Sequence, residues 1–391
     1  MDSLKPNIRM LYPFINLFLS FFFFFHLAIH RPDQRGRLVI LLPLIFFGIL
    51  SFKQSLLLPF ASKLAIIWAQ SILLNLLHVS SLLLIEKQPS PLRRSLRSSY
   101  SLWSNPRLIS ISGNPSTEEE SAALKYRFII SRLAKLALFY TLHQSIQPRL
   151  YAAIIGTLKA EDVADTAPWR RFPAALTMHS ALVRSYVAVA WICDNYVTMN
   201  TLHALLGLIT VSTGFHHPHD WSPLFGGLRG MCGLRSFWSR FWHRLARRPY
   251  TNVGVVVVES VYVVGFPRAL LRAIIVSLVV FLVSGLSHAA VSRQMGWRDW
   301  LDVKWFMLNF LGCLVETVVM GSVAWVAARL SLQRELYVFR KSWLGCFIGF
   351  AWVFCFFYWS VPSWQYPRLH QELIEKERWE MLRSFIGDLN S

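Results

Sequence analysis

Long apolar runs are the feature that most constrains how this chain folds. Residues 269–291, 305–328 and 342–360 each contain at most one Lys, Arg, Asp or Glu. A helix needs about 20 apolar residues to cross the hydrocarbon core of a bilayer. Only 16% of the chain is charged, against about 25% in a typical soluble domain, and 54% is hydrophobic. The sequence therefore predicts an all-α, polytopic integral membrane protein.

The number of spans follows from the remaining apolar stretches. Residues 173–213 are interrupted at Cys193–Asn195 and count as two spans or as one span plus a re-entrant piece, while residues 253–266 are short for a span. The total predicted is about eight or nine transmembrane helices. The other expected spans cover residues 11–29, 38–52, 56–85 and 128–158.

The charge of the chain is strongly positive. Lys and Arg number 40 against 21 Asp and Glu, giving a net charge of +19. No recognised nucleic-acid-binding module accompanies this charge, so we expect no nucleic acid partner. Basic loops on the cytosolic side, in contact with membrane lipid headgroups or an anionic cofactor, explain it more simply.

The cysteines and clustered histidines do not form a metal-binding pattern. The five cysteines have no C-x-x-C spacing and are interpreted as small buried hydrophobic residues, neither disulfide-bonded nor zinc-bound. The histidine-rich stretch 215–221 is divided by Pro218, which favours a turn over a fixed ligand geometry. No metal is predicted.

A basic, Trp-rich segment occupies residues 221–249. If residues 234–248 form one helix, Trp238 and Trp242 lie on one stripe, and an arginine stripe lies on the opposite side. This pattern is typical of a helix at the membrane interface, with its rings among acyl chains. The arginine stripe comprises Arg240, Arg244 and Arg247.

These arginines are also candidates for binding an anionic ligand. Between Arg229 and Arg248 there are six arginines and no acidic residue. The planar guanidinium group matches phosphate oxygens better than an ammonium does. We expect Arg240, Arg244, Arg247 and Arg248, with Trp238 and Trp242, to bind a phosphate-bearing acyl-CoA, although a plain interfacial anchor would show the same pattern.

His288 is the first candidate for chemistry. It ends an apolar stretch with no other charge from Ile274 onward, and ionisable residues inside membranes are commonly functional. A neutral imidazole there can accept a proton from an alcohol as it attacks a thioester, which is general-base catalysis. The alternative is a structural histidine hydrogen-bonded to Ser284 or to a neighbouring helix.

His243 is the second candidate. On the helical wheel it lies at the border between the Trp and Arg stripes. There it can donate a hydrogen bond to a thioester carbonyl as negative charge develops, or orient the acceptor. An interfacial histidine without a role is the alternative.

Three ordered motifs resemble the wax-synthase-like branch of the membrane-bound O-acyltransferase family. They are W-x-P-L-F-G at 221–226, S-F-W-x-R-F-W-H at 236–243 and F-x-V-S-G-L-x-H at 281–288. The resemblance implies transfer of an acyl group from acyl-CoA to a hydroxyl, with His288 as the catalytic histidine and His243 as its partner. Within the branch the chain most resembles fungal terpenoid and meroterpenoid O-acetyltransferases.

Composition along the chain predicts a domain division, and the resemblance implies which part is the catalytic core and where the protein is located. We expect N-terminal transmembrane helices in 1–85, a polar loop on the cytosolic side in 86–127, the catalytic core in 128–362 and a charged tail in 363–391 that ends as a surface helix. Acetyl-CoA is the expected co-substrate, with no permanently bound cofactor, and the acceptor is a lipophilic alcohol. The expected location is the endoplasmic reticulum membrane.

Other functions are open from the sequence. A long-chain acyl-CoA alcohol acyltransferase, or wax synthase, is the nearest alternative, because the sequence does not show the size of the acyl tunnel. A transporter would show paired repeats or several mid-membrane polar residues, and neither is evident. A non-enzymatic membrane scaffold is the remaining alternative.

Overall fold

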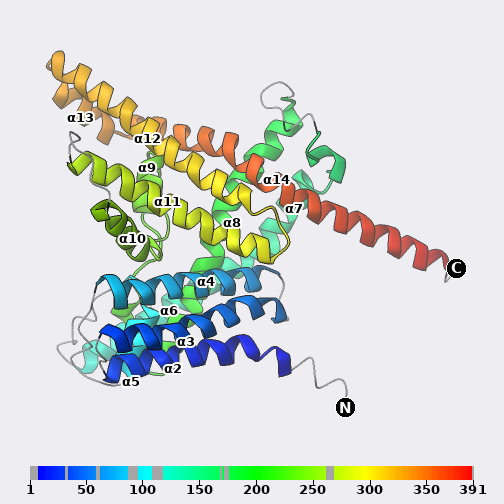
Figure 1. Cartoon of the computed structure of the whole chain (residues 1–391). Helices are drawn as coiled ribbons and strands as arrows, with labels where there is room; N and C mark the ends of the chain where they lie inside the picture. The colour runs from blue at the N-terminus through cyan, green and yellow to red at the C-terminus, as the bar shows by residue number, and fades with distance from the viewer. Residues whose placement is uncertain are drawn as a thin grey trace. The chain divides into compact units, whose positions relative to one another are not determined.

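The computed structural model describes residues 8–30, 34–58, 62–86, 96–107, 118–167, 170, 176–260 and 268–389. Every regular element within these residues is helical (Figure 1). The chain forms two compact units. Unit 1 comprises residues 1–109 and 244–311, and unit 2 comprises residues 110–243 and 312–391. The division predicted along the sequence stays a prediction.

The N-terminal half of unit 1 is a layer of apolar helices. Helix α2 (Tyr12–His30) packs on α3 (Gln34–Lys53), which packs on α4 (Ser62–Ser80). Their core includes Phe24, Leu44 and Val79, all buried. Most of the predicted third span lies in Lys63–Ile85, which consists of α4 and a π-helical end (Ser81–Ile85), and a short 3-10 turn (Gln54–Leu57) ends the preceding span.

Part of the predicted polar loop 86–127 is helical. Helix α5 (Leu96–Ser104) lies within it, and the ring of Trp103 lies 5.2 Å from that of Phe21 on α2. The aromatic residues of this stretch therefore pack on a neighbouring helix, which stabilises local helical structure. The rest of the stretch up to Thr117 is partly outside the described residues.

The second half of unit 1 holds the helix pair α10 (Arg247–Ser260) and α11 (Arg268–Gln294), followed by the beginning of α12 (Trp300–Arg329). Helix α10 packs closely on α11, because a Cβ atom at Gly254 would lie 3.0 Å from the Cα of Val276. This arrangement joins the end of the basic segment to the helix that carries His288.

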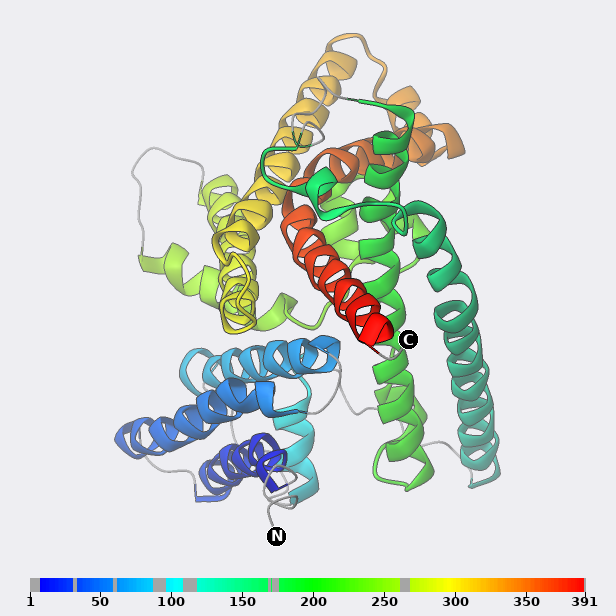
Figure 2. The ribbon, with the colours of Figure 1, turned by 90° about the vertical axis from the view of Figure 1, so that its right-hand side faces the viewer.

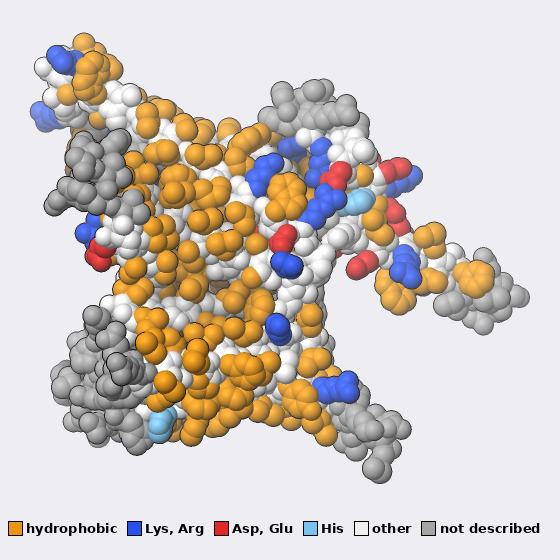
Figure 3. Space-filling model, in the orientation of Figure 1, with side chains coloured by type: hydrophobic (Ala, Val, Ile, Leu, Met, Phe, Trp, Pro, Cys, Tyr) orange, Lys and Arg blue, Asp and Glu red, His pale blue; other side chains and the backbone are white. Residues whose placement is uncertain are grey.

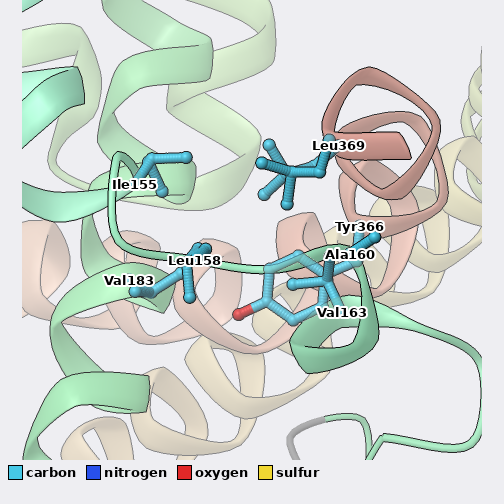
Figure 4. Packing of buried hydrophobic residues seen from close by; sticks show 8 residues of the cluster. Ile155, Leu158, Ala160, Val163, Val183, Tyr366 and Leu369 are labelled. Atoms are coloured by element: carbon cyan, nitrogen blue, oxygen red, sulfur yellow. The ribbon is translucent and has the colours of Figure 1, made fainter. Parts of the chain in front are cut away.

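Unit 2 is built around α8 (Met178–Ser212), which lies beside α6 (Glu118–Thr141) (Figure 2). Helix α6 continues through a π-helical stretch (Leu142–Ile146) into α7 (Gln147–Ile154). The rest of α12, α13 (Gln333–Lys341) and α14 (Trp343–Leu389) complete the unit. Tyr366 and Leu369 of α14 pack against Ile155 and Leu158 in its buried core (Figure 4).

Helix α8 runs without a break, although the sequence favoured an interruption at Cys193–Asn195. The carboxylate of Asp194 accepts a hydrogen bond of 2.7 Å from the side chain of Gln147 on α7. A polar residue that finds a partner on a neighbouring helix does not need to end its own helix. One continuous helix therefore replaces the two candidate stretches.

Five helices among the described residues are long and apolar enough to cross a membrane. The polytopic, all-helical prediction is confirmed, but the count of eight or nine spans is not. Hydrophobic side chains cover much of the face in Figure 3, whereas charged side chains are frequent along the C-terminal part of α14. The five helices are Leu38–Leu57, Lys63–Ile85, Ala269–Gln294, Trp300–Arg329 and Trp343–Phe385.

The cysteine prediction was wrong for two residues. Cys232 and Cys346 form a disulfide within unit 2, with their Cα atoms 4.8 Å apart. Their positions are 114 residues apart, so their pairing had no local spacing signal. Cys193, Cys313 and Cys355 are free thiols.

Candidate functional site

His288 lies on α11 in unit 1, half-buried against the start of α12. Its ring stacks on that of Phe306, with ring centroids 4.9 Å apart and an interplanar angle of 24°. One turn earlier, Gly285 lets the two helices approach, because a Cβ atom there would lie 3.0 Å from the Cα of Val303. The S-G-L-S-H sequence thus fixes the imidazole against an aromatic face.

Tyr250 contacts the residue that precedes this histidine, and the sequence did not single it out. Its hydroxyl donates a hydrogen bond of 3.1 Å to the Oγ of Ser287, the residue before His288. Burial raises the pKa of Tyr250, so the phenol stays protonated at neutral pH. Its position two residues after Arg248, at the end of the basic segment, was the available signal.

Arg248 is held inside unit 1 by residues of α4 and its continuation. Its guanidinium lies 2.8 Å from a carboxylate oxygen of Glu86 and 3.1 Å from Nδ1 of His78. It also donates a hydrogen bond of 3.2 Å to the carbonyl of Pro106. Burial lowers the pKa of Arg248 and the Glu86 carboxylate raises it, and an arginine in such a pair remains charged.

Glu86 makes a second contact with α10, through Asn252. Asn252 donates hydrogen bonds from its amide to Glu86 and, at 2.8 Å, to the Oγ of Ser81. Arg248 and Asn252, on one helix, therefore share a single carboxylate. This network ties the beginning of α10 to the end of α4.

Two arginines of the basic segment lie exposed in unit 1. Arg244 and Arg247 have exposed side chains. Burial, together with the positive charge of Arg244, lowers the pKa of Arg107, which places these two cations close enough to repel. Like charges brought together in this way favour an anionic ligand.

The predicted helix 234–248 does not form, which corrects the interfacial-helix interpretation. Helix α9 (Leu234–Ser236) continues as a π-turn (Phe237–Phe241) and then ends, with Trp242 in an extended conformation. The carbonyl of Phe241 accepts a hydrogen bond of 2.8 Å from the backbone N–H of Gly226 instead of from the next helical turn. A tertiary hydrogen bond has replaced the helical one.

The tryptophans of this segment pack inside unit 2 and do not form a lipid-facing stripe. The ring of Trp242 is buried and stacks 4.9 Å from that of Trp191 on α8. It also lies 5.3 Å from Phe237 and 5.7 Å from Trp238. Burial of this kind explains the aromatic motif by core packing.

His243 and Arg240 also belong to unit 2, whereas His288, Arg244, Arg247 and Arg248 belong to unit 1. His243 is half-buried, with its ring 5.4 Å from Trp242 and 5.9 Å from Phe225. Arg240 is exposed. The structure thus brings together the residues of unit 1 around α10 and α11, and places His243 on the aromatic cluster of unit 2.

The histidine-rich stretch forms a turn. The backbone N–H of His217 donates a hydrogen bond of 2.8 Å to the carboxylate of Asp220, and a 3-10 turn (Pro218–Asp220) follows. Within the part of the chain that the structure describes, no group of three or more His, Cys, Asp or Glu residues is arranged to hold a metal ion.

Part of the sequence that contains the candidate residues is similar to known proteins. Residues 221–308 match the model of the membrane bound O-acyl transferase family. The predicted family resemblance is confirmed. The matched segment runs from the aromatic motif of unit 2 through α10 and α11 to the first turns of α12, so it includes His243, Tyr250 and His288.

Several fungal acetyltransferases are similar to this chain. Acetyltransferase atnC of Arthrinium sp is 26% identical over 195 residues, which are 49% of this chain and 43% of the relative. Acetyltransferase ple2 of Rhodocybe pseudopiperita is 28% identical over 196 residues, 49% of this chain and 48% of the relative. Acetyltransferase nanB of Aspergillus nanangensis is 27% identical over 251 residues, 63% of this chain and 57% of the relative.

The chain therefore matches about half of the length of these relatives. No solved structure matches it.

Proposed function

We propose that this chain is a membrane O-acetyltransferase that transfers acetyl from acetyl-CoA to a hydroxyl of a lipophilic terpenoid or meroterpenoid. The proposal rests on the family-matched segment 221–308, in which a half-buried histidine of α11 stacks on Phe306 of α12. Relatives named acetyltransferases support the acyl group. Membrane helices favour an acceptor that partitions into lipid.

In this proposal His288 is the general base. Its neutral imidazole takes the proton of the acceptor hydroxyl while the hydroxyl oxygen attacks the carbonyl carbon of the thioester. The carbon–sulfur bond then breaks, and the CoA thiolate takes up the proton from the imidazolium. Products are the acetate ester and free CoA. His243 is proposed to donate a hydrogen bond to the carbonyl oxygen in the transition state.

The arginines are proposed to bind the phosphates of acetyl-CoA. Arg240, Arg244 and Arg247 are exposed, as a phosphate ligand requires. Arg248, which is paired with Glu86, contributes by holding α10 in place. Trp238 and Trp242, whose rings pack on each other, are proposed to support this part of the site through that packing rather than by touching the acyl chain. The proposed location is the endoplasmic reticulum membrane.

An assay with two different acyl donors tests which acyl group the chain transfers. Microsomes containing the chain are incubated with labelled acetyl-CoA or palmitoyl-CoA and a panel of terpenoid and fatty alcohols. We expect labelled acetate esters of the terpenoid alcohols. Palmitoyl esters of fatty alcohols, with no acetyl transfer, would identify a wax synthase instead, and no ester from any pair, beyond that of empty microsomes, would favour a scaffold.

A further inference from the structure

A fully buried carboxylate lies on the helix that faces His288. Asp302, near the beginning of α12, has an exposed fraction of 0%. Other residues of the same helix region are also buried, including Trp305 and Phe306. A carboxylate taken out of water is costly unless a charged or hydrogen-bonding partner compensates it. Asp302 therefore needs a partner within the packed junction.

The pairing of α11 with α12 shows which residue faces Asp302. The rings of Phe281 and Phe310 lie 6.3 Å apart, and Gly285 faces Val303 and Phe306. Going forward along α11 thus corresponds to going backward along α12. The turn that follows Gly285 carries His288, and the turn that precedes Phe306 carries Asp302.

Both groups lie where α11 and α12 touch. Each side chain of a helix tilts toward the N-terminus of its own helix. His288 accordingly reaches back to stack on Phe306. Asp302 and Phe306 are four residues apart and share one face of α12. The backbone carbonyl of Asp302 lies 3.6 Å from a Cβ atom built at Gly285, so this face is in contact with α11.

We propose that Asp302 is a positioning residue for His288. Its carboxylate accepts a hydrogen bond from one imidazole nitrogen and so leaves the other nitrogen unprotonated and directed toward the acceptor hydroxyl. The same carboxylate stabilises the imidazolium that forms when the hydroxyl proton is taken, and it does not itself bind substrate. This role depends on the proposed function of His288 as base.

Kinetics of an isosteric variant test the role. Asp302→Asn should lower kcat about 10- to 100-fold with little change in the KM for acetyl-CoA, because the base loses its orientation while the donor site is untouched. Asp302→Glu should recover part of kcat. The matched control is Asp299→Asn, which makes the same charge change one turn earlier and should keep wild-type kcat.

A double variant separates positioning from simple stabilisation. In the His288→Ala background, Asp302→Asn should cause no further loss, since residues that act as one unit are not additive. A further loss of the same size, or an unchanged kcat in the single Asp302→Asn variant while His288→Ala is inactive, would overturn the inference and leave the proposed function standing.

Cross-linking tests whether residues 288 and 302 are close together, and it does not require the protein to be active. In the double variant His288→Cys with Asp302→Cys, a short bifunctional thiosulfonate should bridge the two thiols. The control pair, His288→Cys with Lys304→Cys, should not be bridged because Lys304 is exposed. Equal bridging of both pairs would contradict the inference, and this reading holds even if the chain transfers no acetyl group.

Discussion

At the residue scale, the basic segment contains two kinds of arginine. Arg248 is engaged by Glu86, which lies far away in the sequence, and its side chain is 20% exposed. Arg247, its neighbour, is exposed. The six arginines of the segment look equivalent in sequence, because a partner on a distant helix leaves no local pattern. The contact of Arg248 with Glu86 distinguishes it, as a structural arginine, from the exposed Arg247.

Substituting the two neighbouring arginines in turn tests this distinction. Arg248→Gln should lower the free energy of unfolding by about 3 kcal/mol, because it leaves a largely buried Glu86 without its cation. Arg247→Gln should change stability by less than about 0.5 kcal/mol and raise the KM for acetyl-CoA. Denaturant unfolding in detergent and initial rates give the two quantities.

The opposite pattern would contradict this assignment. If Arg248→Gln were as stable as the wild type and raised only the KM, the Glu86 pair would contribute little and Arg248 would belong with the phosphate-binding residues.

At the scale of elements, the sequence predicted long apolar helices well and irregular ones poorly. Residues 269–291 and 305–328 lie within α11 and α12 as expected. The helix expected over 234–248 ends at Phe241, since the carbonyl of Phe241 bonds to Gly226 and not to the following turn. The spacing of apolar residues shows which face of a helix would be buried, but it does not show whether a tertiary hydrogen bond ends that helix.

The candidate site was predictable to a similar extent. His288 was a candidate because an ionisable group inside a membrane is costly and because three ordered motifs point to it, and its role stays a prediction. Tyr250 and Asp302 did not, because their relation to His288 depends on how α10 and α12 pack against α11. The tryptophans were misinterpreted because core packing and lipid contact produce the same spacing.

The contact of α11 with α12 gives a prediction at this scale. Gly285→Val should separate the two helices, because a Cβ atom there already approaches the Cα of Val303 at 3.0 Å. We expect a loss of about 1–3 kcal/mol in stability from overpacking, with lower acetyl transfer. Gly321→Val is the matched control on α12, since a Cβ atom there meets nothing within 4 Å.

Thermal unfolding in detergent measures both glycine variants. Equal unfolding midpoints for Gly285→Val and Gly321→Val would show that the close approach of α11 and α12 does not contribute to stability.

At the scale of the whole chain, helix α14 exceeds the needs of a membrane span. Its 47 residues extend about 70 Å at 1.5 Å per residue, whereas the hydrocarbon core is about 30 Å thick. Charged residues are frequent after Arg368, including Glu372, Lys376 and Glu380. The helix is therefore longer than the hydrocarbon core requires, and the surface helix expected at its end stays a prediction.

The proposed role of His288 in acetyl transfer is tested by removing its imidazole. Transfer from labelled acetyl-CoA to a terpenoid alcohol is compared in microsomes carrying equal amounts of wild type, His288→Ala and His179→Ala, an exposed histidine of α8. General-base catalysis predicts that His288→Ala loses about 10²- to 10⁴-fold in rate, while His179→Ala retains it. Undiminished transfer by His288→Ala would contradict the account.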